Sequence, residues 1–242
     1  MPGPGTVGTV PDLIVPRRFC GPPSSGNGGY TAGALASRVE ASAVSVSLLA
    51  PPPLDTPMVV ETVDGLTVAS VDGTPVSRAE VGTIDQPTVE PVPVEEARAA
   101  TEAFVGLDSH PFPTCFVCGP DRADGLRIFP GPVADQDGLT RLAATWTPDD
   151  SIADDLAAVT WGALDCIGGW AGGLADRTMV LARMTARVDT LPLIGEEHVV
   201  VGLACGRDGR KTFTAATLHD SDGRVVARAE HLWVAVDAAD FA

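Results

Sequence analysis

Hydrophobic and polar residues alternate in the first third of the chain as they do in an antiparallel sheet with one buried face. Residues 44–48 (VSVSL) show this period of two, and three consecutive prolines end the segment soon afterwards. Ahead of it, residues 27–37 (NGGYTAGALAS) predict a helix of small residues that is capped by Asn27. Further strands are predicted at residues 57–63, 66–71 and 76–84. The predicted order is one helix and then four strands.

The second half of the chain repeats this order. Residues 156–175 carry a single charge among small and apolar residues, which predicts a buried helix. A longer segment, residues 125–146, precedes this helix and holds two hydrophobic stretches, at residues 126–129 and 139–146, on either side of an Asp-Gly turn. Four strands are predicted after the helix, at residues 179–188, 198–204, 212–218 and 225–236.

Two segments in different halves of the chain share their sequence pattern. Residues 72–80 (DGTPVSRAE) and 222–230 (DGRVVARAE) both begin with an Asp-Gly pair, which predicts a tight turn between strands, and both end in Arg-Ala-Glu. The shared arginine and glutamate fall on one strand face, where they predict structural ion pairs. The repeat indicates that the chain contains two copies of the same fold.

The repeat divides the chain into three parts. Residues 1–85 form the first unit and residues 114–242 the second, and each is long enough to close a core of small aliphatic side chains. Between them, residues 86–113 begin with a proline-rich stretch and continue as a short helix around residues 95–104. The sequence therefore predicts two similar domains and a partly structured linker.

This doubled pattern of one helix against a curved antiparallel sheet resembles the double hotdog proteins of the acyl-CoA thioesterase type. The resemblance rests on Gly28-Gly29 in the first helix, on WGALDC at residues 161–166, on CFVCG at residues 115–119 and on the two hairpins. It implies an α+β fold of two tandem hotdog halves. It also implies hydrolysis of an acyl thioester, carried by CoA or by an acyl carrier protein, in a pocket between the halves of a protein that forms homodimers.

Composition narrows the choice of partners. The formal net charge is −16 and Lys211 is the only lysine, so attraction to nucleic acid or to an anionic membrane is disfavoured. The chain has no apolar run long enough to span a membrane, and its amino terminus lacks the pattern of a signal peptide, which predicts a cytoplasmic protein. The abundance of Ala, Val, Gly and Arg with so little Lys resembles actinobacterial sequences.

The cysteines are odd in number and scattered, which argues against a disulfide framework. Cys115 and Cys118 have the spacing of half a zinc site, but among potential further ligands only His110 lies close in sequence. A structural turn is the preferred interpretation, and no metal or other cofactor is expected. The cysteines are Cys20, Cys115, Cys118, Cys166 and Cys205.

Asp165 is the strongest candidate for a catalytic residue. It is the only charged residue in the predicted helix 156–175, and a buried carboxylate needs a partner or a pocket because it otherwise takes up a proton. In the thioesterases that the chain resembles, an acidic residue of the second helix orients or activates the attacking water, and Asp165 stands at the matching place. The alternative is that Asp165 has only a structural role, as a buried helix cap or as a partner in a salt bridge.

The first helix offers groups that complement an acid. It has no acidic residue, but Gly28 and Gly29 present backbone N–H groups at the positive end of a helix, where an oxyanion would be stabilised. Asn27 and Trp161 are expected to contact the substrate at the same place. The alternative is that Gly28 and Gly29 have only a structural role, because they allow the chain to turn tightly into the helix.

In the family that the chain resembles, a threonine on the next strand and a glutamine on the last strand accompany the acid. Counted back from Pro192, the threonine position falls at about Ala182, which has no hydroxyl group. The glutamine position falls on His231, whose place in the period-two pattern points it toward the helix. His231 is therefore a second catalytic candidate, to hold the water or pair with Asp165, and a structural core histidine is the alternative.

The missing hydroxyl keeps two other functions open beside hydrolysis. One is a protein that binds acyl groups or other hydrophobic ligands without catalysis. The other is a hydratase-like enzyme that processes acyl groups on the same fold.

Overall fold

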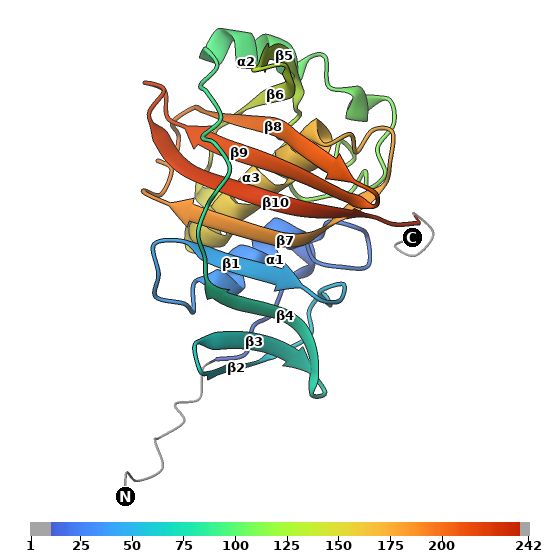
Figure 1. The fold of residues 1–242 in the computed structure, drawn as a ribbon, viewed down its shortest axis with the longest axis vertical. Coiled ribbons are helices and arrows are strands. Elements are labelled where there is room, and N and C mark those ends of the chain that lie inside the picture. The colour runs from blue at the N-terminus through green and yellow to red at the C-terminus, as the bar shows by residue number, and fades with distance from the viewer. Residues whose placement is uncertain (1–10, 238–242) are drawn as a thin grey trace, which may run out of the picture.

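The structure is a computed structural model that describes residues 11–237. Its strands form one antiparallel sheet in the order β2-β3-β4-β1-β7-β10-β9-β8-β6-β5 (Figure 1). The helices are α1 (Gly28–Ala36), α2 (Val94–Thr101) and α3 (Leu156–Ala171). The strands of the first half are β1 (Val44–Leu48), β2 (Val59–Val63), β3 (Leu66–Val71) and β4 (Thr74–Val81). Those of the second half are β5 (Gly131–Gln136), β6 (Leu139–Trp146), β7 (Met179–Val188), β8 (His198–Asp208), β9 (Lys211–His219) and β10 (Val225–Ala235).

The sheet consists of two similar halves that meet edge to edge. Helix α1 packs against β1 and β4, whereas α3 packs against β6 to β10. The halves join where β1 pairs with β7, with Val46 opposite Met184. Long helices on one antiparallel sheet, one helix to each half, confirm the α+β double hotdog fold that the sequence predicted.

The ends of the two long helices follow from local sequence. Asn27 caps α1 as predicted, because its Oδ1 accepts a hydrogen bond from the N–H of Tyr30 at 2.8 Å. Helix α3 begins at Leu156 but ends at Ala171, four residues earlier than predicted. The chain leaves the helix there because Gly173 adopts the left-handed conformation, with φ +94°.

Strand β5, at one edge of the sheet, begins after the hydrophobic stretch at residues 126–129. Ile128 and Phe129 are buried in the core instead, and the Phe129 ring stacks on that of Phe104 with the ring centroids 5.2 Å apart. Strand β5 begins at Gly131, where the chain passes so close to the carbonyl group of Ala100 that a side chain would collide with it.

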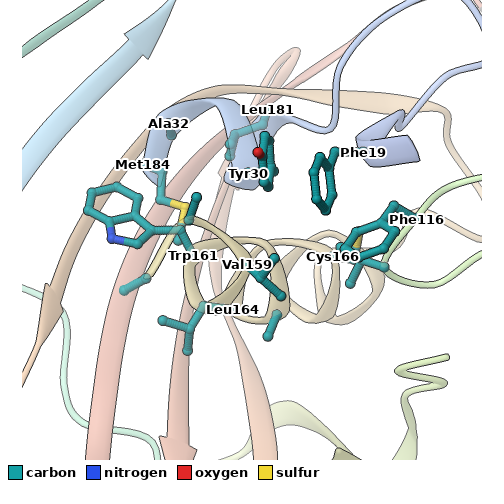
Figure 2. Close-up of a cluster of buried hydrophobic side chains, with 14 of the residues drawn as sticks. Phe19, Tyr30, Ala32, Phe116, Val159, Trp161, Leu164, Cys166, Leu181 and Met184 are labelled. Atoms are coloured by element: carbon teal, nitrogen blue, oxygen red, sulfur yellow. The ribbon is translucent and has the colours of Figure 1, made fainter. Parts of the chain in front are cut away.

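Helices α1 and α3 cross in direct contact. Gly29 and Gly33, one turn apart on α1, face Asp165 and Trp161 of α3. A methyl group on Gly33 would lie 2.8 Å from the Trp161 Cβ, and one on Gly29 would lie 2.7 Å from the Trp161 carbonyl oxygen. Figure 2 shows the Trp161 ring beside Met184 and Ala32. The crossing therefore fixes Asp165 at the start of α1.

The linker crosses the sheet face opposite the two long helices (Figure 1). Glu230 accepts hydrogen bonds from the N–H groups of Asp85 and Gln86 at 3.0 and 3.1 Å, and Arg228 donates one to Thr88 at 3.2 Å. The ion pairs predicted for the repeated Arg-Ala-Glu segments are not formed among residues 11–237. In the second half these side chains hold the linker instead.

The division into residues 1–85, 86–113 and 114–242 stays a prediction, as does the homodimer. Residues 1–10, on which the argument about a signal peptide largely rests, lie outside the described part. Within that part, no helix is both long and apolar enough to span a lipid bilayer.

Candidate active site

A cavity of about 240 Å³ lies beside the start of α1 and the middle of α3. The first half contributes Asn27, Gly28 and residues 48–52, and the second half contributes Asp165 and residues 179–182. Further lining residues are His110 and Phe112 at the end of the linker and Cys115 and Cys118 just after it. Both halves therefore form the walls, as the resemblance implied.

Asp165 is buried in the wall of this cavity and is held by the other half of the protein. Its Oδ2 accepts a hydrogen bond from the N–H of Gly29 at 2.9 Å. Its Oδ1 is buried and has no hydrogen-bond partner among the described residues. Burial raises the pKa of Asp165 to about 7, against the opposing hydrogen bond from the Gly29 N–H. One carboxylate oxygen is thus fixed, and the other has no partner among the described residues although Asp165 itself borders the cavity.

The structure separates the roles of Gly28 and Gly29, which the sequence treated as one pair of donors. The Gly29 N–H donates to Asp165 and is not free to bind an oxyanion. Gly28 is the first residue of α1 and lines the cavity. The first N–H groups of a helix have no partner within the helix and lie at its positive end. Of the two, Gly28 is therefore the donor that a ligand oxygen can use.

Asn27 and Trp161 differ in their access to the cavity. Asn27 lines it, but its Oδ1 caps α1 and its Nδ2 lies 3.8 Å from the Cys115 Sγ and 3.7 Å from the Cys166 Sγ. Trp161 is not among the lining residues and packs under Gly33. The predicted substrate contact through Trp161 therefore has no support in this geometry.

His231 faces α3 as its strand position predicted, but it does not line the cavity. Its Nδ1 is 3.1 Å from the hydroxyl oxygen of Thr214, which also accepts a hydrogen bond from the Trp233 indole N–H at 3.1 Å. The imidazole lies so close to Gly168 that a methyl group there would be 2.7 Å from Nδ1. His231 is placed to close the core beneath α3. Ala182, which lies near the position where the resemblance implies a threonine, does line the cavity.

Buried His231 and His219 are expected to make the folded state sensitive to acid. Burial lowers the pKa of each from 6.5 to about 4, so below pH 6.5 the unfolded chain takes up protons that the folded protein does not. The free energy of unfolding should fall between these pH values by up to about 1.4 kcal/mol per pH unit for each histidine. Urea unfolding across this range measures the slope, which His219→Gln should reduce. An unchanged slope in that variant would contradict the assignment.

The structure also brings together three cysteines that the sequence left apart. The Sγ atoms of Cys115, Cys118 and Cys166 all lie within 4.8 Å of one another, and those of Cys115 and Cys166 are 3.7 Å apart. All three are buried, free and in contact with the cavity. Hydrogen bonds from the thiols of Cys118 and Cys166 hold the pKa of Cys115 well below its usual range. No spacing rule links Cys166 to the CxxC motif, although it directly follows Asp165 in the sequence.

The fold is shared with known structures, whereas sequence comparison finds no relative. No protein-family model matches the chain, and no curated protein sequence matches it either. The tesB protein of Mycobacterium avium subsp. paratuberculosis superposes with a TM-score of 0.55 at 14% identity, over 87% of each chain. Acyl-CoA thioesterase II TesB2 of Mycobacterium marinum gives 0.51 at 14% identity, over 81% of this chain and 80% of that one.

A third structure extends the comparison beyond named thioesterases. A hot dog fold protein of unknown function from Alicyclobacillus acidocaldarius gives a TM-score of 0.53 at 16% identity, over 88% of each chain. At such identities the comparisons show the fold alone. They confirm the resemblance to double hotdog proteins of the TesB type, including actinobacterial ones.

Proposed function

We propose that this protein hydrolyses acyl thioesters carried by CoA or by an acyl carrier protein. The observation that carries the proposal is the placement of Asp165, whose Oδ2 is fixed by Gly29 and whose Oδ1 has no partner among the described residues. The N–H of Gly28 borders the same cavity. A cavity with largely apolar walls and a few convergent polar groups suits an acyl chain with one reactive carbonyl.

In the proposed reaction, Asp165 accepts a proton from a water molecule while the water oxygen attacks the carbonyl carbon of the thioester. The carbonyl oxygen gains a negative charge, which the N–H of Gly28 stabilises. The intermediate then collapses, the carbon–sulfur bond breaks, and the thiolate takes up the proton from Asp165. Because Ala182 offers no hydroxyl group, Asp165 is the side chain that orients the water.

A protein that binds acyl groups without catalysis is the second candidate. Two observations favour it over a fully equipped hydrolase. Ala182 lines the cavity where the family that the chain resembles has a threonine, and His231 does not reach the cavity at all. The cavity itself fits both functions equally well.

Turnover and binding measurements separate the two candidates. The purified protein is incubated with acyl-CoA thioesters of increasing chain length, and we expect thioester absorbance to fall for at least one of them. Binding of a thioether analogue, which cannot be hydrolysed, should show the same preference for chain length. Binding without turnover across the whole series would support the non-catalytic candidate. The absence of both would reject the proposal that this cavity takes acyl thioesters.

A further inference from the structure

We propose that Cys115, Cys118 and Cys166 bind one zinc ion in the wall of the cavity. From the sequence alone no metal was expected, because the CxxC pair had only His110 close by as a further potential ligand. The fold supplies that ligand from helix α3, 51 positions away from Cys115. This proposal concerns the thiol cluster and is independent of thioester hydrolysis.

The sulfur positions fit a tetrahedral thiolate site. Zinc–sulfur bonds are about 2.3 Å long, which places two sulfur ligands of a tetrahedral ion about 3.8 Å apart. The Sγ atoms of Cys115 and Cys166 are 3.7 Å apart, and the Sγ of Cys118 lies within 4.8 Å of both. Small side-chain adjustments therefore bring all three sulfurs onto one ion.

The CxxC segment folds into a tight turn. The Gly119 N–H donates to the Cys115 carbonyl at 2.9 Å. A methyl group on Gly119 would lie 2.6 Å from that carbonyl oxygen, so the tight turn requires glycine. The turn therefore holds the thiols of Cys115 and Cys118 within 4.8 Å of each other.

Asn27 adds a donor from the first half of the protein. Its Oδ1 is fixed by capping α1, which turns Nδ2 toward the Cys115 and Cys166 Sγ atoms at 3.8 and 3.7 Å. Such a group orients thiolate ligands without binding the metal itself. The cluster is thus supported from the start of α1, from α3 and from the turn that follows the linker.

The fourth position of the proposed site belongs to a ligand from the cavity. His110 lines the cavity, but its Nδ1 accepts the N–H of Phe112 at 2.9 Å, which leaves the ring proton on Nε2. This Nε2 is buried and has no hydrogen-bond partner among the described residues. As a donor rather than a metal ligand, it is suited to hydrogen-bond a water molecule on the ion. Three protein ligands and one exchangeable position are typical of an open zinc site.

Metal analysis of matched cysteine variants tests the proposal. Protein from zinc-supplemented cultures, purified without chelators, should contain about one zinc per chain by mass spectrometry of the elements. Cys118→Ser and Cys166→Ser should each lose at least about nine-tenths of it, since removal of one thiolate leaves two protein ligands. Cys205→Ser is the control, because Cys205 lies outside the cluster, and it should keep its zinc. Full zinc content in both cluster variants would overturn the proposal.

A titration of the wild-type chain covers the case in which these variants do not fold. Reduced protein that has been stripped by a chelator is titrated with Zn²⁺ alone or with Co²⁺, whose thiolate absorption bands report sulfur ligands. We expect saturation at about one equivalent, a higher unfolding temperature, and sulfur neighbours at about 2.3 Å in X-ray absorption. No binding, or binding without sulfur neighbours, would overturn the proposal.

Discussion

Asp165→Asn is expected to lower kcat/KM for thioester hydrolysis about 10²–10⁴-fold, which is the usual contribution of a positioned general base. Asparagine has nearly the same shape, and its amide oxygen can still accept the Gly29 N–H that lies 2.9 Å from Asp165 Oδ2. It cannot take a proton from water. Because the rest of the cavity is unchanged, the loss should appear in kcat, and KM should change little. Steady-state kinetics on the best substrate of the series measures both constants.

Asp155→Asn is the matched control for this substitution. Asp155 also connects the two helices, since it accepts a hydrogen bond from the Tyr30 hydroxyl at 2.9 Å, but it does not line the cavity. The control removes the same charge near the start of α3 and should leave kcat/KM nearly unchanged. Wild-type turnover in Asp165→Asn would show that this carboxylate is not the base. An equal loss in both variants would indicate damage to the helix packing instead of to the chemistry.

The features that depend on a few neighbouring residues could be predicted from the sequence. Examples are the Asn27 cap, the alternating strand β1 and the Asp-Gly turns, because each depends only on residues that are close together in the sequence. In the structure Asp72 and Gly73 have φ values of 49° and 75°, the left-handed conformation that such a turn requires. Together with the internal repeat, these local features predicted two similar units of one helix and one antiparallel sheet, and the resemblance to double hotdog proteins then implied the fold.

The site depends on packing and could be predicted only in part. Equivalent helices of a repeated fold meet, so the closeness of Asp165 to the start of α1 was foreseeable. The use of the Gly29 N–H by Asp165 was not, because it follows from how closely the helices cross. The alternation of residues along β10 predicted correctly that His231 points toward α3. It did not predict which part of α3 the side chain meets. The approach of Cys166 to the CxxC turn likewise depends on the path of the chain between that turn and α3.

Gly33→Ala is expected to lower the free energy of unfolding by about 1–3 kcal/mol. The added methyl group would lie 2.8 Å from Cβ and Cγ of Trp161 and 2.9 Å from the Cα of Ala158. A backbone atom cannot move away without displacing α3, so the clash should outweigh the roughly 1 kcal/mol by which alanine favours a helix over glycine. Urea unfolding, followed by circular dichroism, measures the difference.

Gly162→Ala provides the same change of residue type at the same helix crossing. A methyl group there would meet Val117 Cγ2 at 3.4 Å and Asn27 Oδ1 at 3.5 Å, which are ordinary contact distances. This variant should therefore gain up to about 1 kcal/mol of stability from helix propensity. Opposite signs for the two substitutions would establish that the closeness of the crossing, rather than glycine as such, determines the outcome. If both substitutions stabilise the protein, α1 and α3 lie farther apart than the structure has them, and the Gly29–Asp165 hydrogen bond that positions the proposed base could not form.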